Sequence, residues 1–138
     1  LPKWIILSET RSTEVRYLLE SLSTGAHGLT TIHTDDVRNI PDRMKNMAGG
    51  TEDLNRIEND TYRFIDIGIL VKSFRKDSGG IQRRIEQIGV FDRYGREWKE
   101  SINEITMVVE DGRVVSRKFP VNIARKFAEA GYPQPLGG

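Results

Sequence analysis

The stretch "KWIILSETRSTEVRYLLESLSTGAHGLTTIHT" (residues 3–34) contains the patterns of a strand, a helix and a second strand, in that order. Residues 3–8 are a short apolar run rich in β-branched side chains, which is typical of a strand buried on both faces. Residues 13–23 have apolar side chains at helical spacing, and Gly25 suits the position after a helix end. Residues 29–34 predict the second strand. Because a strand–helix–strand unit favours a parallel sheet, the stretch predicts an α/β fold.

The helix between these strands has one apolar face. Ser12 or Thr13 can cap its N-terminus, with Glu14 in the first turn. Its apolar side chains recur at i, i+3, i+4 and i+7, and we expect them in the core: Val15, Leu18, Leu19 and Leu22.

A further helix is expected over residues 36–48, capped by Asp35 or Asp36. Pro41 lies inside this pattern, so the helix either kinks there or begins near Pro41. Its apolar side is formed by Val37, Ile40, Met44 and Met47.

The pattern changes after a glycine-containing break at residues 48–53. Thr51 can cap a short helix near 52–61, and strand-like runs then predict an antiparallel meander. The Asp-Gly pair at positions 111–112 is a strong hairpin signal. No linker separates the parts, so we expect one domain over residues 1–138, with a front part (1–50) and a meander with closing helix (51–138). The expected elements of the second part are strands 62–75, 81–93 and 103–119, turns 76–80 and 110–113, and a helix near 120–131.

The composition excludes several classes of protein. The 138 residues contain 21 Lys and Arg against 20 Asp and Glu, so the net charge of +1 indicates no global nucleic-acid or membrane footprint. The absence of cysteine excludes disulfide scaffolds and thiolate metal sites, and fits a reducing compartment. No apolar run approaches the roughly 20 residues that cross a bilayer. Since the chain starts at Leu1 and a strand pattern begins at Trp4, we expect a piece of a larger protein.

Glu9 is the first candidate functional residue because it directly follows the first strand. Open α/β sheets bind ligands at the carboxyl edge of their strands. A carboxylate there can hold Mg²⁺, directly or through water, or orient an attacking water. The alternative is an ordinary turn residue or a helix N-terminal glutamate.

The two histidines of the chain, His27 and His33, form the second group of candidates. His33 ends the second predicted strand, so it belongs to the same edge as Glu9 and can donate to a phosphate oxygen. The alternative is a histidine bonded to local backbone. His27 lies in the glycine turn, where histidines are usually exposed. A metal site of both histidines with Asp35 and Asp36 has unfavourable spacing and no further His or Cys to complete it.

Basic residues give the third set of candidates. Arg11 follows Glu9 by two positions and can either bind phosphate in a bidentate manner or pair with Glu14. A group of basic residues on the meander predicts a basic surface, which is usually a solvated face and less often an interface with a subunit or substrate: Arg63, Arg75, Lys76, Arg83 and Arg84. The chain has no G-x-x-x-x-G-K-[ST] phosphate loop and no nucleophile elbow.

Together these motifs resemble the C-terminal half of the type II/type IV secretion ATPases, the traffic ATPases of conjugation and pilus assembly. "IILSETR" resembles their Walker B segment, and "STGAHGLTTIH" resembles their histidine box. The run "FIDIGILVKSFRKDSGGIQRRIEQIGVFD" is similar to their C-terminal hairpin. Ser8 stands where the family has the glycine before the Walker B glutamate, and His27 is displaced by one position from the first box histidine.

The resemblance implies a partial RecA-like P-loop core and a set of roles. Glu9 would serve Mg²⁺ and the attacking water, and His33 would contact the terminal phosphate of ATP and couple its loss to motion. Arg11 and His27 would assist in nucleotide binding. The family's phosphate loop lies upstream of this half, so these 138 residues alone are expected not to hydrolyse ATP.

The resemblance also implies partners and a location. Family members work as homo-hexamers with membrane-associated secretion or pilus machinery, in the cytoplasm at the inner face of the cell membrane. No base-specific nucleic-acid binding is predicted. The alternative function is a non-catalytic α/β module that binds a protein partner or regulates one.

Overall fold

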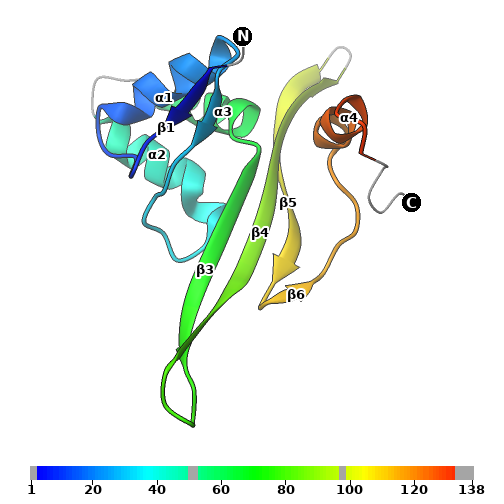
Figure 1. Cartoon of the computed structure of the whole chain (residues 1–138). Helices are drawn as coiled ribbons and strands as arrows, with labels where there is room; N and C mark the ends of the chain where they lie inside the picture. Colours follow the sequence, from blue (N-terminus) through cyan, green and yellow to red (C-terminus); the bar gives the residue numbers. More distant parts are fainter. Residues whose placement is uncertain (1–2, 50–52, 97–98, 133–138) are drawn as a thin grey trace.

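The first three elements form the expected parallel unit. The computed structural model describes residues 3–49, 53–96 and 99–132 (Figure 1). Strand β1 (Trp4–Ile6) leads into helix α1 (Glu14–Ser23), which returns the chain to strand β2 (His27–Leu29). The two strands pair in parallel, with Trp4 opposite His27 and Ile6 opposite Leu29. The predicted strand–helix–strand unit is therefore confirmed.

These two strands are shorter and more exposed than predicted. The regular part of β2 ends at Leu29, so the prediction of a strand over 29–34 was wrong, although Thr10 N–H still donates to the carbonyl of Thr31. Burial on both faces was also wrong, because Trp4 and Ile6 are 65% and 70% exposed. Side chains alternate between the faces of a strand, and α1 packs on the face that carries Gly28, against Leu18 and Leu22.

Helix α1 has the predicted core face but not the predicted cap. Val15, Leu18 and Leu19 are buried. Thr13 occupies the cap position without a capping hydrogen bond from its side chain. The carboxylate of Glu14 instead accepts from the backbone N–H of Arg11 at 3.0 Å.

The next helical segment has two parts. A short 3₁₀ turn, η1 (Val37–Asn39), is capped by Asp36, whose carboxylate accepts from the N–H of Arg38 at 2.8 Å. Helix α2 (Ile40–Ala48) follows, with Pro41 in its first turn. Proline is tolerated there because the first N–H groups of a helix have no intrahelical partner. Of the two alternatives for Pro41, the helix start is confirmed.

Helix α3 (Leu54–Phe64) differs from the prediction at both ends. Asp53 is its cap and accepts from the N–H groups of Asn55 and Arg56. Thr51, the predicted cap, lies outside the described residues. The helix continues to Phe64, so the strand predicted from residue 62 begins five residues later.

An antiparallel sheet with strand order β3-β4-β5-β6 forms the rest of the molecule. Strand β3 spans Ile67–Arg75, β4 spans Ile81–Arg96 and β5 spans Lys99–Glu110. The predicted turn after Glu110 is present, with Asp111 and Gly112 at φ of 52° and 72°. The strand predicted over 103–119 breaks at this turn, because only the two-residue β6 (Arg113–Val114) follows it before helix α4 (Val121–Glu129).

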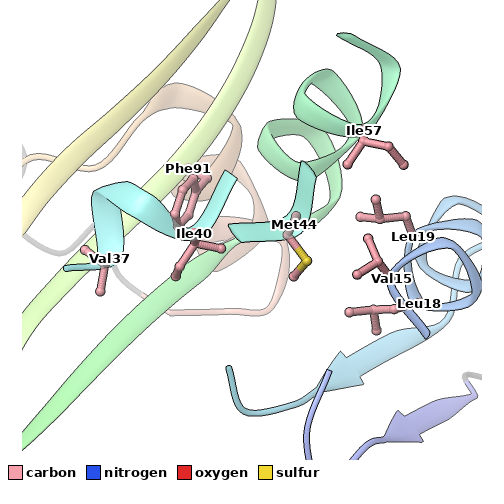
Figure 2. Close-up of a cluster of buried hydrophobic side chains, with 8 residues drawn as sticks. All are labelled: Val15, Leu18, Leu19, Val37, Ile40, Met44, Ile57 and Phe91. Carbon is pink, nitrogen blue, oxygen red and sulfur yellow. The ribbon is translucent and has the colours of Figure 1, made fainter. Parts of the chain in front are cut away.

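The main core lies between α1, α2, α3 and the base of the antiparallel sheet. Met44 of α2 lies between the α1 side chains and Ile40 in Figure 2. Each fully buried side chain of this size contributes about 1.5–3 kcal/mol by leaving water. The buried members are Val15, Leu18, Leu19, Val37, Ile40, Met44, Ile57 and Phe91.

A second, smaller cluster fixes α4 to the sheet. Val90 and Val108 are buried with Ile123 of α4. The fold is thus mixed α/β, with a small parallel sheet and a curled antiparallel sheet (Figure 1). None of the helices in the described ranges has the length and apolar character needed to cross a membrane.

Candidate functional site

Glu9 and His33 meet just beyond the parallel strands. Glu9 comes three residues after the end of β1, and His33 comes four residues after the end of β2. Nε2 of His33 lies 2.8 Å from Oε1 of Glu9. The expectation that both side chains emerge at one edge of the sheet is therefore confirmed in its geometry.

Arg11 completes this cluster. Its Nε and Nη2 atoms donate to Oε2 of Glu9 at 2.9 and 2.6 Å. Its guanidinium therefore pairs with Glu9 rather than with Glu14, which binds only the backbone N–H of Arg11. Each carboxylate oxygen of Glu9 thus faces one basic side chain.

Three threonines hold the two segments side by side. The N–H of Thr10 donates to the carbonyl of Thr31 at 2.8 Å, and the Thr10 and Thr30 hydroxyls are 2.7 Å apart. The hydroxyl of Thr31 donates to the carbonyl of Ser8. Thr10 is buried, so its hydrogen bonds are shielded from competition with water. This ladder positions Glu9 beside His33 after the regular strands have ended.

Arg43 of α2 joins the site, and the sequence reasoning did not find it. Its Nε donates to the carbonyl of His33 at 3.1 Å, and its charge lowers the pKa of Glu9. No local pattern in the sequence identifies Arg43, because its link to the site depends on how α2 packs against the segment that follows β2.

The charges of the cluster keep Glu9 ionised. The hydrogen bond from Arg11 is the main cause that lowers the pKa of Glu9, partial burial opposes it, and the charges of Arg11, His33 and Arg43 lower it further. A carboxylate with a lowered pKa is a weak proton acceptor at neutral pH. Glu9 is therefore better suited to hold a cation or orient a water than to act as a general base.

The exposure of the three side chains differs. The side chain of Glu9 is 22% exposed, whereas those of Arg11 and His33 are 74% and 87% exposed. Arg11 and His33 can therefore turn their donors toward a solute without unfolding the site. Phosphate oxygens match such donors in charge and geometry.

His27 lies elsewhere. It stands opposite Trp4 at the start of the parallel pair, with ring centroids 5.1 Å apart. Glu9 comes five residues after Trp4, which corresponds to about 16 Å in an extended chain. The structure does not bring His27 to the cluster of Glu9, Arg11 and His33.

A multi-ligand metal centre has no structural support in the described part of the chain. No group of three or more His, Cys, Asp or Glu side chains there could hold a metal ion. The carboxylate of Asp36 already accepts hydrogen bonds from the backbone N–H and from the guanidinium of Arg38. A cation at the cluster would have Glu9 as its protein ligand, which suits Mg²⁺ because this ion commonly uses one or two carboxylates together with waters and phosphates.

Comparison with known proteins relates half of the chain to part of a longer protein. No family model matches the chain. An uncharacterized protein of Bacillus anthracis is 32% identical in an alignment of 73 residues, which covers 51% of this chain and 17% of that protein. The chain thus matches a relative of which it spans only about a sixth.

Proposed function

We propose that this chain is the C-terminal part of a RecA-like ATPase domain that couples ATP hydrolysis to secretion, pilus assembly or conjugative DNA transfer. The observation that carries the proposal is the pairing of Glu9 with both Arg11 and His33 beyond the carboxyl ends of two parallel strands. Ligands of open α/β sheets bind at that edge.

The contacts of Glu9 suggest how the site responds to a nucleotide. Arg11 and His33 satisfy Glu9 in the free chain, and a terminal phosphate is a competing anion for the same donors. Arg11 and His33 then donate to phosphate oxygens, which releases the Glu9 carboxylate to orient the attacking water. Phosphoryl transfer depends on such positioned charges rather than on covalent chemistry with the protein.

Glu9 also fits Mg²⁺ through its charge. Its lowered pKa keeps the carboxylate ionised, as an oxygen ligand must be. When bound, Mg²⁺ neutralises charge that develops on the phosphates. In this proposal the phosphate loop comes from sequence upstream of Leu1, and neighbouring subunits of a homo-hexamer complete the working assembly.

Hydrolysis by the protein that contains this chain and the phosphate loop tests the proposal. Glu9→Gln should reduce turnover about 10²-fold or more, because it removes a positioned catalytic charge, and should largely preserve binding of a fluorescent ATP analogue. Glu20→Gln is the matched control, since Glu20 is an exposed α1 residue paired with Arg16. Turnover of the Glu9 variant within threefold of wild type would refute the role of Glu9.

The isolated chain provides an independent test. A phosphate-release assay on the pure 138-residue chain should show no turnover above buffer, since no phosphate-loop motif occurs in its sequence. Sustained hydrolysis that is proportional to the concentration of the chain would show that the phosphate loop has been wrongly placed.

A non-catalytic interaction module is the second candidate function. The observation that favours it is the long hairpin of β3 and β4, which extends beyond the helices (Figure 1) and is exposed from Val71 to Ile85. This function is an alternative to the ATPase function, because it requires no catalytic role of Glu9.

A further inference from the structure

The hairpin of β3 and β4 extends beyond the helices that cover the base of the sheet (Figure 1). The outer part of the hairpin, residues 71–85, forms an arm. All residues from Val71 to Ile85 are exposed. Strand β3 is at the edge of the sheet, since β4 is its only neighbour in the strand order of the described chain. The arm therefore presents the unpaired backbone N–H and C=O groups of an edge strand.

One face of the β3–β4 hairpin carries an apolar stripe, which within the arm is interrupted by Ser73, Arg75 and Arg83. The register places Ile69 opposite Ile88 and Val71 opposite Ile85, so these side chains lie on one face with Ile67 and Ile81. This stripe runs out from the second core, where Val90 and Ile88 pack beside Ile123. Exposed apolar side chains in such a row mark an interaction surface. Their exposed fractions are 43% for Ile67, 56% for Ile69, 54% for Val71, 62% for Ile81 and 47% for Ile85.

The arm is also strongly basic, although the whole chain has a net charge of only +1. Residues 71–85 hold five basic residues and a single acidic one, Asp77. Arg84 is paired with Glu86. Among the described residues the other four basic side chains have no ion-pair partner: Lys72, Arg75, Lys76 and Arg83.

These features disfavour a second copy as the occupant of the edge. β3 carries Lys72 and Arg75 and no acidic residue. Antiparallel pairing of two β3 strands would therefore set basic side chains near basic side chains, which is unfavourable in a sheet.

Nucleic acid is disfavoured by the apolar stripe. Single strands bind proteins through aromatic platforms along a basic groove. The exposed stripe is aliphatic. Phe74, the only aromatic residue of the arm, has one ring face occupied by the guanidinium of Arg84, which lies 4.4 Å from the ring centroid.

We propose that the β3 edge of the arm binds an extended protein segment in which apolar and acidic residues alternate. The segment adds a strand beside β3, its apolar side chains continue the stripe of Ile69 and Val71, and its carboxylates face Lys72 on the opposite face. Main-chain hydrogen bonds supply affinity in this mode, and the alternate side chains supply specificity. This inference does not depend on the ATPase proposal.

Three labelled peptides of the length of β3 test this binding. An alternating valine–glutamate peptide should bind the 138-residue chain saturably in fluorescence anisotropy. A valine–lysine peptide should bind about 10-fold more weakly or worse, since the attractive pair with Lys72 becomes a repulsive one on an arm that is basic as a whole. A valine–glutamate peptide with a central proline should lose a similar factor, because proline removes a ladder N–H. Equal affinity for the three peptides would overturn the proposal.

Variants of the arm locate the binding surface. Lys72→Glu should reverse the preference between the glutamate and lysine peptides, because Lys72 is the charged residue of β3 on the face of the carboxylates. Lys118→Glu, at an exposed residue outside the arm, should leave the preference unchanged. Hydrogen exchange should slow at Ile67–Arg75 when the glutamate peptide binds. If exchange slows elsewhere in the chain while the exchange of the β3 amides is unchanged, the peptide does not pair with the β3 edge and the proposal is refuted.

The competing occupants give different results. A single-stranded oligothymidylate that binds more tightly than the glutamate peptide and displaces it would assign the arm to nucleic acid. A concentration-dependent dimer in sedimentation, abolished by Val71→Lys, would assign it to a second copy. Either result would overturn the proposal.

Discussion

The side-chain oxygen of Gln87 accepts a hydrogen bond from the backbone N–H of Val37 at 2.9 Å. Fifty positions separate the two residues, and both are buried. The bond ties η1, which follows the candidate site in sequence, to the central strand β4. It also satisfies a backbone N–H that would otherwise be buried without a partner.

Gln87→Leu should therefore destabilise the fold by about 1–3 kcal/mol, because leucine fills the space but leaves the Val37 N–H unpaired. Urea denaturation followed by circular dichroism measures the loss. Gln82→Leu, in the exposed part of β4, should change stability by no more than about 0.5 kcal/mol. Equal stability of the two variants would show that the Gln87 bond is dispensable.

A second prediction concerns two glycines that face each other across β3 and β4. Gly68 pairs with Gly89, and the missing side chains leave a notch in the sheet surface. Val37 of η1 and Ile40 of α2 pack into this notch. A Cβ at Gly89 would lie 2.8 Å from Cγ2 of Val37, and one at Gly68 would lie 2.7 Å from Cδ1 of Ile40. Valine is stiff at its single side-chain torsion, whereas the end of an isoleucine can rotate away.

Gly89→Ala should thus cost more stability than Gly68→Ala, within the range of about 1–3 kcal/mol typical of overpacking. Thermal unfolding of both variants checks this order. Gly95→Ala is the control, since its Cβ would meet only the Ser101 hydroxyl at 3.7 Å. If the Gly95 variant loses as much stability as the Gly89 variant, the notch is not the cause.

The positions of Glu9 and His33 could be predicted because they follow from local patterns in the sequence. The helical spacing of Val15, Leu18 and Leu19 identifies α1, and the strands on either side must then run in the same direction. Side chains that follow the ends of parallel strands meet at one edge. This geometry needs no knowledge of the rest of the fold.

Other features depend on contacts that no local pattern encodes. "YRFIDIGILV" suits a helix end and a strand start equally, so the boundary between α3 and β3 was predicted too early. The exposure of Trp4 depends on which faces of β1 are covered, and an apolar run does not reveal this. Arg11 had two carboxylates within reach, Glu9 and Glu14, and the geometry of the turn decides between them.

Arg43 provides a third prediction, about how the segment after β2 is held. Arg43→Gln removes the donor to the carbonyl of His33, so amide exchange over residues 31–36 should accelerate several-fold. Exchange in β4 should remain unchanged because, within the described residues, no hydrogen bond or ion pair joins Arg43 to this strand. Arg56→Gln on α3, whose side chain pairs with Asp60, is the control. Unchanged exchange over 31–36 in the Arg43 variant would mean that the threonine ladder alone holds the segment.

The last prediction concerns the pKa of Glu9. Arg11 is the main cause of the lowered pKa, so Arg11→Gln should raise the pKa of Glu9 toward its ordinary value of 4.5. The carboxyl ¹³C shift of Glu9, followed by NMR during an acid titration, measures the change, with Arg56→Gln as control.

The same contact should make the stability of the fold depend on pH. Because the pKa of Glu9 is lower in the folded state than in the unfolded state, the ionised carboxylate stabilises the fold at a pH above the unfolded-state pKa. This contribution is lost as the pH falls through the folded-state pKa. The stability difference between wild type and Arg11→Gln should therefore be present at neutral pH and shrink below pH 4.5. A difference that is constant across this range would show that Arg11 acts through packing and not through the charge of Glu9.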